Sequence, residues 1–338
     1  GRPALVVSFA ALVGGLVVVG LDLGHLGRAW EVIGLASPRS LMAWEISFFT
    51  AYGLLLLATM RVAFRGGLAR RAAGEGFDAR VARALLLGRR GGDEAREAGW
   101  LRAFALVGAP LAVVLIGASG ALFGVVGARP YWHTGLFPLL FLTAALASAA
   151  AALALIAALT RWTHGRDGWS EQIAFLGRLT LGLLALELVL EWADISIAFY
   201  SRTPAAWDAY ELILTGPYLW VFWLVHLLAG VAVPIAILSL RGRSAAWVGT
   251  AGALVAGTFV AVRLNVVIPG LAVPQIEGLD RAFVERGLSY EYFPSGMEWL
   301  VAVFAVALVS GLIAAGLRFL PVTAEERHEA LVAAGAGP

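Results

Sequence analysis

Long apolar segments alternate with short polar ones along the whole chain. Each apolar segment has about the 20 residues that an α-helix needs to cross a bilayer. In lipid the backbone must form its hydrogen bonds within the segment, which favours helices, and the period-two alternation typical of a membrane barrel does not occur. The pattern predicts an all-α fold, a polytopic transmembrane helix bundle with about eight spans. These spans lie at about 4–23, 42–64, 101–124, 137–160, 172–199, 216–240, 245–268 and 296–320.

One polar connection is much longer than the others. Residues 65–99 are rich in arginine and predict a cytoplasmic insert that contains a short amphipathic helix. The insert interrupts a transmembrane domain that we assign to residues 1–320, and residues 321–338 then form a cytoplasmic C-terminal tail. Within this domain the alanine-rich stretch ALASAAAALALIAAL is typical of helices that pack closely in lipid.

Composition agrees with a membrane protein and excludes several kinds of site. Hydrophobic residues make up 60% of the chain and charged residues 14%, whereas soluble domains have about 25% charged residues. The absence of cysteine excludes disulfides and cysteine-ligated iron–sulfur clusters within this chain. All 25 basic residues are arginine and most lie in loops, so we expect contact with membrane lipid and not with nucleic acid.

The distribution of arginine predicts the orientation in the membrane. With the insert in the cytoplasm, 18 of the 25 arginines fall on the cytoplasmic side, as the positive-inside rule favours. Both ends of the sequence are then cytoplasmic, and the connection Leu21–Glu45 faces the outside. The arginines on the outer side are Arg28, Arg39, Arg129, Arg202, Arg263, Arg281 and Arg286.

Ionisable residues inside the predicted spans gather toward the outer half of the membrane. Glu187, Glu191 and Asp194 are spaced so that they share one face of the fifth span. Arg263 and Asn265 lie near the outer end of the seventh span, and Arg263 is the expected compensating charge. Such residues are costly in a membrane and are usually functional. They indicate either a buried ion pair that fixes helix packing or a site that handles protons or binds a ligand.

The side chains available as ligands indicate which cofactors the chain could bind. Only one of the five histidines, His226, lies well inside a predicted span, so we expect no haem, and no clustered ligand set indicates a metal. A quinone needs a flat aromatic slot, hydrogen-bond donors and a group that exchanges protons. The outer region supplies all three. The candidates for a quinone pocket are Asp22, His25, Trp44, Glu45, Tyr131 and His133.

Four stretches of the sequence carry recognisable motifs. They are LDLGHLGRAWEV with SPRSLMAWE, the run Gly117–Ala151 that includes ARPYW and PLLFL, RLNVVIPG at Arg263–Gly270, and EYFPSGMEWLV at Glu291–Val301. In this order they resemble the polysulfide reductase membrane-subunit family, or NrfD-like family, over most of residues 1–320. Two positions depart from the family pattern: His25–Leu26 replaces its usual Arg-Pro pair, and Ile116 stands where some relatives have histidine.

The resemblance implies a membrane subunit of a respiratory oxidoreductase in the bacterial cytoplasmic membrane. Such subunits bind menaquinone or ubiquinone and dock a four-cluster, ferredoxin-like iron–sulfur protein, which connects to a molybdopterin or other catalytic subunit. They carry no redox metal of their own. The family usually has one further helix before the span that starts near Pro3, so we expect an additional N-terminal helix beyond this sequence.

The resemblance also suggests roles for the outer residues. It places the quinone and the docked partner on the outer, periplasmic side. The buried polar residues are then candidates for a proton path, namely Glu187, Glu191, Asp194, Arg263 and Asn265. The candidates for the partner-docking surface are Arg28, Arg39, Arg129 and Pro130.

Two other functions stay open at this point. A proton- or ion-translocating transporter would also use the carboxylate row, and it predicts a repeat in the two halves with broken helices near the midplane. A passive membrane anchor would tether a redox complex without quinone chemistry. In that case changes at His25 or Glu45 would leave quinone-linked turnover intact.

Overall fold

A computed structural model describes most of the chain. All regular secondary structure within the described residues is helical, and eight of their helices are long and apolar enough to cross a membrane. The predicted fold class and number of spans are therefore confirmed, and the chain is a multi-pass integral membrane protein. The described residues are 2–31, 37–86, 94–164, 170–274, 276, 278–282, 290 and 292–322.

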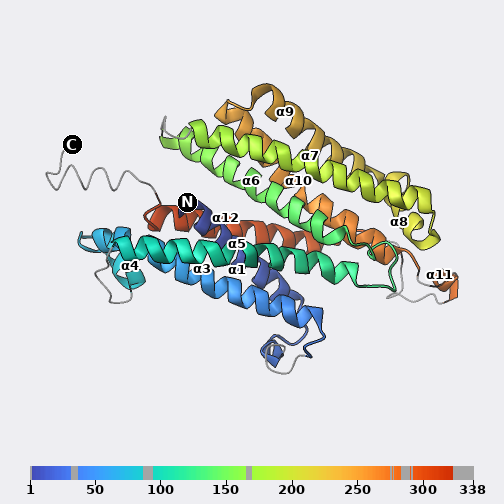
Figure 1. The fold of residues 1–338 in the computed structure, drawn as a ribbon, viewed down its shortest axis with the longest axis horizontal. Helices are drawn as coiled ribbons and strands as arrows, with labels where there is room; N and C mark the ends of the chain where they lie inside the picture. Colours follow the sequence, from blue (N-terminus) through green and yellow to red (C-terminus); the bar gives the residue numbers. More distant parts are fainter. Residues whose placement is uncertain are drawn as a thin grey trace. The chain divides into compact units, whose positions relative to one another are not determined.

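The long helices agree with the predicted spans, and the residues described between them include four short helices (Figure 1). The predicted insert contains α4 (Phe77–Leu86), as expected, while much of the predicted tail lies outside the described residues. The long helices are α1 (Arg2–Asp22), α3 (Leu41–Ala72), α5 (Glu94–Gly124), α6 (Phe137–His164), α7 (Ser170–Ser201), η3 (Val221–Ala232) continued by α9 (Val233–Arg241), α10 (Ala245–Ala272) and α12 (Gly296–Phe319). The other short elements are η1 (Leu26–Arg28), α8 (Pro204–Leu214) and α11 (Leu279–Ala282).

The chain divides into two compact units, which are described separately. Unit 1 comprises Gly1–Leu115 and Pro294–Pro338, and unit 2 comprises Ile116–Phe293. The last turns of α5, from Ile116 onward, belong to unit 2. Each unit therefore has its own set of helices and its own buried residues.

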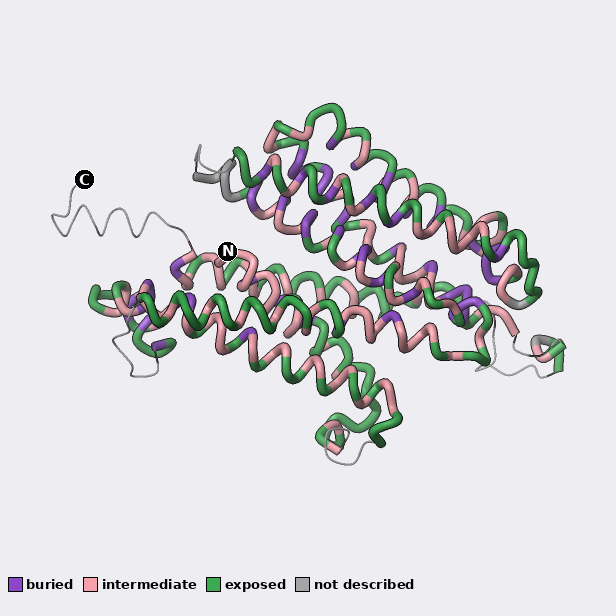
Figure 2. Tube along the Cα trace, viewed as in Figure 1, coloured by how far each residue is buried: buried purple, intermediate pink, exposed green. Residues whose placement is uncertain are grey.

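Unit 1 combines membrane helices with the amphipathic helix α4. Helix α1 packs against α12 and α3, and α4 packs against α3. The buried face of α4 contributes Ala82 and Leu86 to a small core that also holds Val6, Phe64 and Leu68. No residue of α12 is buried, and large apolar residues such as Leu300, Val303 and Val306 are more than half exposed. Figure 2 shows only exposed and intermediate positions along this helix. This is the pattern expected of helices whose apolar surface faces lipid.

Unit 2 is built from α6, α7, α10 and the helix formed by η3 and α9. Helix α6 packs against α7 and α10, and α10 also packs against η3. Buried residues line the facing sides of these helices (Figure 2). A Cβ atom at Gly252 would lie 2.5 Å from the carbonyl oxygen of Ala151, so α6 and α10 approach closely only because small residues meet there. The packing role predicted for the alanine-rich stretch of α6 is confirmed.

The sixth predicted span differs from the prediction in its local geometry. Its first half, η3, is a π-helix, and the regular helix α9 begins only at Val233. Pro234 lies in the first turn of α9 and has no N–H, so it cannot donate the usual helical hydrogen bond at this point. Hydrophobicity predicts that a segment spans the membrane, but it does not predict this change of helix type.

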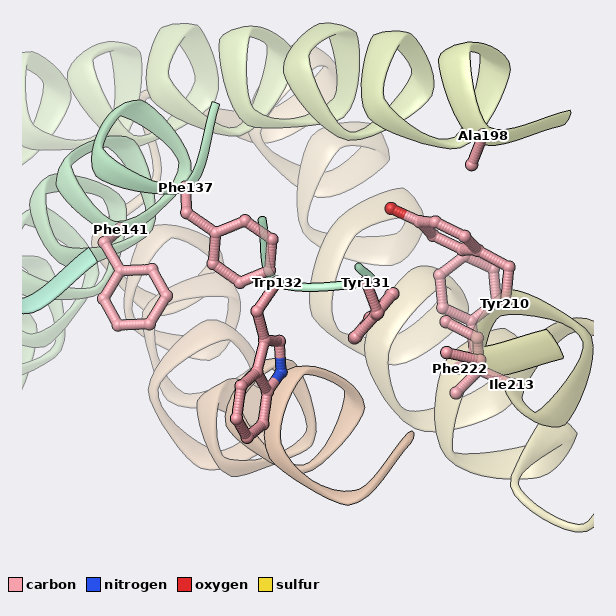
Figure 3. Packing of buried hydrophobic residues seen from close by; sticks show 9 residues of the cluster. Tyr131, Trp132, Phe137, Phe141, Ala198, Tyr210, Ile213 and Phe222 are labelled. Carbon is pink, nitrogen blue, oxygen red and sulfur yellow. The ribbon is translucent and has the colours of Figure 1, made fainter. Parts of the chain in front are cut away.

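A proline in α10 determines where the loop between α5 and α6 binds. Pro269 lies inside α10 and lacks the N–H that would bond the carbonyl of Asn265 four residues earlier. The hydroxyl of Tyr131 donates to that carbonyl instead, at 2.8 Å. The indole Nε1 of Trp132 donates to the next carbonyl, that of Val266, also at 2.8 Å (Figure 3). The loop is thereby fixed to the end of α10.

The fit between this loop and α10 can be tested at Gly270. A Cβ atom there would lie 2.2 Å from the indole of Trp132, so Gly270→Ala should destabilise the protein by about 1–3 kcal/mol through overpacking. The thermal unfolding midpoint in detergent measures this effect. Gly257→Ala is the matched control on the same helix, because a Cβ there has nothing within 4 Å. Equal midpoints for the two variants would contradict the described packing.

Candidate functional site

Three of the four carboxylates of α7 turn toward the interior of unit 2. Glu187, Glu191 and Asp194 line a cavity of about 60 Å³, which we call the inner cavity. Glu187 is only 6% exposed. A water molecule needs roughly 10–15 Å³ of such space, so the inner cavity has room for a few. The predicted shared face of the three acids is confirmed.

The partner of Glu191 is a histidine on the π-helix. His226 is 2% exposed, and its Nε2 lies 3.0 Å from Oε2 of Glu191. An N–H at this nitrogen donates to the carboxylate, and the contact becomes an ion pair when the ring is protonated. The ring also lies against Phe222, with centroids 5.8 Å apart. Short π-helical stretches often occur at functional sites, and this one carries the buried base nearest to the acids.

Asp194 is held by hydroxyl groups from two other elements. The hydroxyl of Tyr210, on α8, donates to Oδ2, and that of Thr134 donates to Oδ1 at 3.4 Å. The rings of Tyr131 and Tyr210 meet edge to face with centroids 5.0 Å apart (Figure 3). Burial raises the pKa of both tyrosines, and the negative charge of Asp194 and Glu191 adds to the increase. Both hydroxyls therefore stay protonated and act as donors.

Arg263 supplies the fixed positive charge of the inner cavity. Its guanidinium lies 4.0 Å from the ring centroid of Phe141, a cation–π contact. Within the described part of the chain, it forms no direct ion pair with a carboxylate, although it lines the same cavity as Glu187. The compensation expected from the sequence therefore acts across the inner cavity. The close ion-pair partner of the acids is His226.

Asn265 directs an unused donor toward the same space. The residue is 7% exposed, lines the inner cavity, and has no hydrogen-bond partner for its side-chain Nδ2 among the described residues. A buried amide without a partner costs about 1–3 kcal/mol. The inner cavity is therefore built for an occupant that can accept a hydrogen bond.

A second and larger pocket lies beside the inner cavity. It has a volume of about 360 Å³, and because the loop after α5 forms one wall, we call it the loop pocket. Tyr131, Asp194 and Tyr210 line both the loop pocket and the inner cavity. The loop pocket is also lined by Gly127, Pro130, His133, Thr134, Ile197, Ala198, Ser201, Thr203 and Ala206.

The structure brings the unit 2 candidates, except Arg129, to the walls of these two spaces. Tyr131 is buried, while His133 is exposed, with Nδ1 2.9 Å from the carbonyl oxygen of Gly124. Arg129 donates to the carbonyl of Val273 at 2.7 Å. Pro130 is exposed and lines the loop pocket.

The remaining candidates lie in unit 1. Asp22 ends α1 and is exposed, as is His25. Trp44 donates its indole N–H to the carbonyl of Pro38 at 2.8 Å, and the neighbouring Glu45 is half-buried.

The two arginines of this connection differ in their contacts. Arg28 forms an exposed ion pair with Glu31 at 3.0 Å. Arg39 is exposed and follows Ser37 and Pro38, just before α3 begins.

Two side chains of the site are missing from the set that the sequence suggested. His226 was noticeable as the one histidine deep in a span, but its pairing with Glu191 joins residues 35 positions apart. Tyr210 lies on a short helix between spans and carries no signal of its own in the sequence. Among the described residues, no group of three or more His, Asp or Glu side chains is arranged to hold a metal ion.

Known proteins resemble the chain over nearly its whole length. Residues 2–275 match the family described as "Polysulphide reductase, NrfD". A selenate reductase subunit of Mesobacillus selenatarsenatis is 30% identical, over 97% of this chain and 79% of that protein. The Hdr-like menaquinol oxidoreductase integral membrane subunit of Archaeoglobus fulgidus is 23% identical, over 98% and 78%. The menaquinone reductase integral membrane subunit of Nitratidesulfovibrio vulgaris is 23% identical, over 96% and 74%.

The raised pKa of Tyr131 and of Tyr210 predicts an incomplete tyrosine titration. Above the ordinary tyrosine pKa of about 10, the folded protein should form fewer phenolates than the unfolded protein. In that range the folded state keeps protons that the unfolded state loses, so stability should fall as pH rises. Ultraviolet phenolate absorbance and the unfolding midpoint measure the two effects.

Single tyrosine variants identify which tyrosines form no phenolate in the folded protein. Tyr131→Phe and Tyr210→Phe should leave the titration of the folded protein unchanged and remove one phenolate each from the unfolded one. A loss of phenolate from the folded protein in either test variant would refute the assignment.

Proposed function

Because the chain belongs to the polysulphide reductase NrfD family, we propose that it is the quinone-binding membrane subunit of a respiratory oxidoreductase complex. It exchanges electrons between quinone or quinol and a docked iron–sulfur subunit. Reduction of a quinone consumes electrons from that partner and protons from side chains of this chain. The other substrate of the complex reacts on a different subunit.

The observation that supports this proposal is the loop pocket with the inner cavity beside it. Ligand pockets usually have volumes of about 300–1,000 Å³, and the loop pocket has about 360 Å³. Its wall offers the apolar side chains of Pro130 and Ile197 together with hydroxyl and carboxyl groups. A quinone headgroup needs this combination of apolar surface, donors and a proton-exchanging acid.

The quinone is menaquinone or ubiquinone, and the names of two relatives favour menaquinone. Tyr131 and His133 would bind it from unit 2. In unit 1, the proposed quinone-binding residues are Asp22, His25, Trp44 and Glu45. Glu187, Glu191, Asp194, Arg263 and Asn265 form the proposed proton path.

The proposed partner is a four-cluster, ferredoxin-like iron–sulfur subunit, which connects to a molybdopterin or other catalytic subunit. The absence of cysteine from this chain means that such clusters are held elsewhere. Of the proposed docking residues, Arg28 and Arg129 already bond within the chain. Arg39 and Pro130 are exposed and are the better placed for contact with a partner.

The arginine distribution supports the location that we propose. The complex lies in the bacterial cytoplasmic membrane, with quinone and partner on the periplasmic side. Residues 1–320 form the membrane domain, and the insert 65–99 and the tail 321–338 face the cytoplasm.

Filling the loop pocket tests the proposed quinone site. Ala206 lines the pocket and is half-buried, so Ala206→Trp should exclude a headgroup and weaken binding of a quinone analogue at least about tenfold, or roughly 1.4 kcal/mol. Fluorescence quenching or calorimetry on the purified complex measures the affinity. Ala246→Trp, at an exposed position outside this pocket, is the matched control. Equal affinities in the two variants would exclude the loop pocket as the binding site.

Two acid-to-amide changes separate the proposed function from its rivals. Glu45→Gln and Glu191→Gln should each slow quinol-dependent reduction of the partner clusters, by about 10²-fold where proton transfer is lost. Stopped-flow absorbance of the clusters measures the rate. Unchanged rates in both variants would contradict the proposed function and indicate a passive anchor. Proton or ion transport without quinone turnover would instead indicate a transporter.

A further inference from the structure

Among the described residues, Asp194 is the one carboxylate that lines both spaces. Tyr131, Asp194 and Tyr210 form the partition between the loop pocket and the inner cavity. The two tyrosines keep their protons, because burial raises the pKa of each, and each donates its hydroxyl to a fixed acceptor. Asp194 is therefore the member of the partition that can give up and regain a proton.

The charges around the inner cavity do not balance when every acid is ionised. Glu187, Glu191 and Asp194 then carry three negative charges. Arg263 supplies one positive charge, and His226 supplies a second only when it is protonated. An uncompensated charge in a buried site costs several kcal/mol. With His226 protonated the group still has one net negative charge, so it is neutral only when it holds one more cation.

The lining of the inner cavity favours a proton as that cation. Beside the three carboxylates it has the N–H donors of Arg263 and of Asn265, whose Nδ2 is buried without a partner among the described residues. A bound metal cation is surrounded by oxygen atoms that act as acceptors, so these two donors do not suit one. Water molecules can accept from Asn265 and donate to the carboxylates, and the inner cavity has room for a few.

We propose that the inner cavity stores one exchangeable proton on its water-bridged carboxylates, and that Asp194 passes protons between this store and a ligand in the loop pocket. In the direction of quinone reduction, the O–H bond of protonated Asp194 breaks and a new O–H bond forms on the ligand oxygen. The resulting carboxylate then takes the stored proton through cavity water. This inference rests on the proposed function, because it takes the loop-pocket ligand to be a quinone.

The surroundings of Asp194 suit such a relay. The hydroxyls of Tyr210 and Thr134 hold its two oxygens in place without supplying a proton of their own. The ionisable groups that face it are Glu191 and Glu187 on its own helix, Tyr210 on α8, Tyr131 and His133 on the loop, Arg263 on α10, and His226 on η3.

The experiment uses the whole complex in proteoliposomes with a soluble quinol analogue. Asp194→Asn should keep analogue affinity within about twofold but slow cluster reduction by about 10²-fold. It should also remove the titrating group from the pH profile of the rate. Asp194→Glu should restore part of the rate. Asp208 is exposed on α8 and lines neither space, so Asp208→Asn is the matched control and should match the wild type.

Infrared difference spectroscopy keeps the test decisive if Asp194→Asn does not assemble. Cycling the wild-type complex between oxidised and reduced quinone should change the band of a protonated carboxyl group. Asn265→Leu, which removes the unpaired donor, should weaken that change while the analogue still binds. A wild-type spectrum without a carboxyl band change would overturn the proposal.

The remaining outcomes separate this inference from the proposed function. If the wild type binds no quinone analogue, the proposed function fails and the relay fails with it. If the wild type binds the analogue and Ala206→Trp blocks it, an unchanged rate and pH profile in Asp194→Asn overturn the relay alone. A turnover rate that depends on sodium concentration would assign the inner cavity to a metal cation and likewise overturn the relay.

Discussion

In lipid every backbone carbonyl needs a donor, and Pro269 leaves the carbonyl of Asn265 without its helical one. Tyr131 meets this need from the loop after α5, and Trp132 bonds the neighbouring carbonyl. Those two contacts fix the loop against α10. Tyr131 then forms part of the wall of both the loop pocket and the inner cavity. The loop wall that the two spaces share is therefore held in part by a hydrogen bond that a proline makes necessary.

The acids of α7 show how costly groups are retained in an apolar bundle. Each has a specific neighbour: Glu191 has His226, Asp194 has two hydroxyls, and Glu187 shares the inner cavity with Arg263. Charged groups in a membrane are tolerated where they face the protein interior or water. A small polar cavity provides both, so the bundle can keep three carboxylates without direct pairing of each to a cation.

The sequence predicts the fold well because the constraint behind the spans is local. A run of about 20 apolar residues must be a helix in lipid, so all eight spans and the amphipathic helix α4 could be predicted. The shared face of the α7 acids follows from helical spacing in the same way. The contacts of Glu191 with His226 and of Asp194 with Tyr210 join separate elements, and neither spacing nor hydrophobicity encodes them. Spacing and hydrophobicity do not encode the π-helical geometry of η3 either.

The close fit of Gly270 against the Trp132 ring has an evolutionary consequence. A side chain at position 270 is tolerated only if position 132 carries a smaller residue, and an amide N–H at position 269 would compete with Tyr131 for the Asn265 carbonyl. Positions 131, 132, 269 and 270 are thus free to change together but not singly. Related sequences should show them as a covarying set, although more than 130 residues separate the two halves of the set.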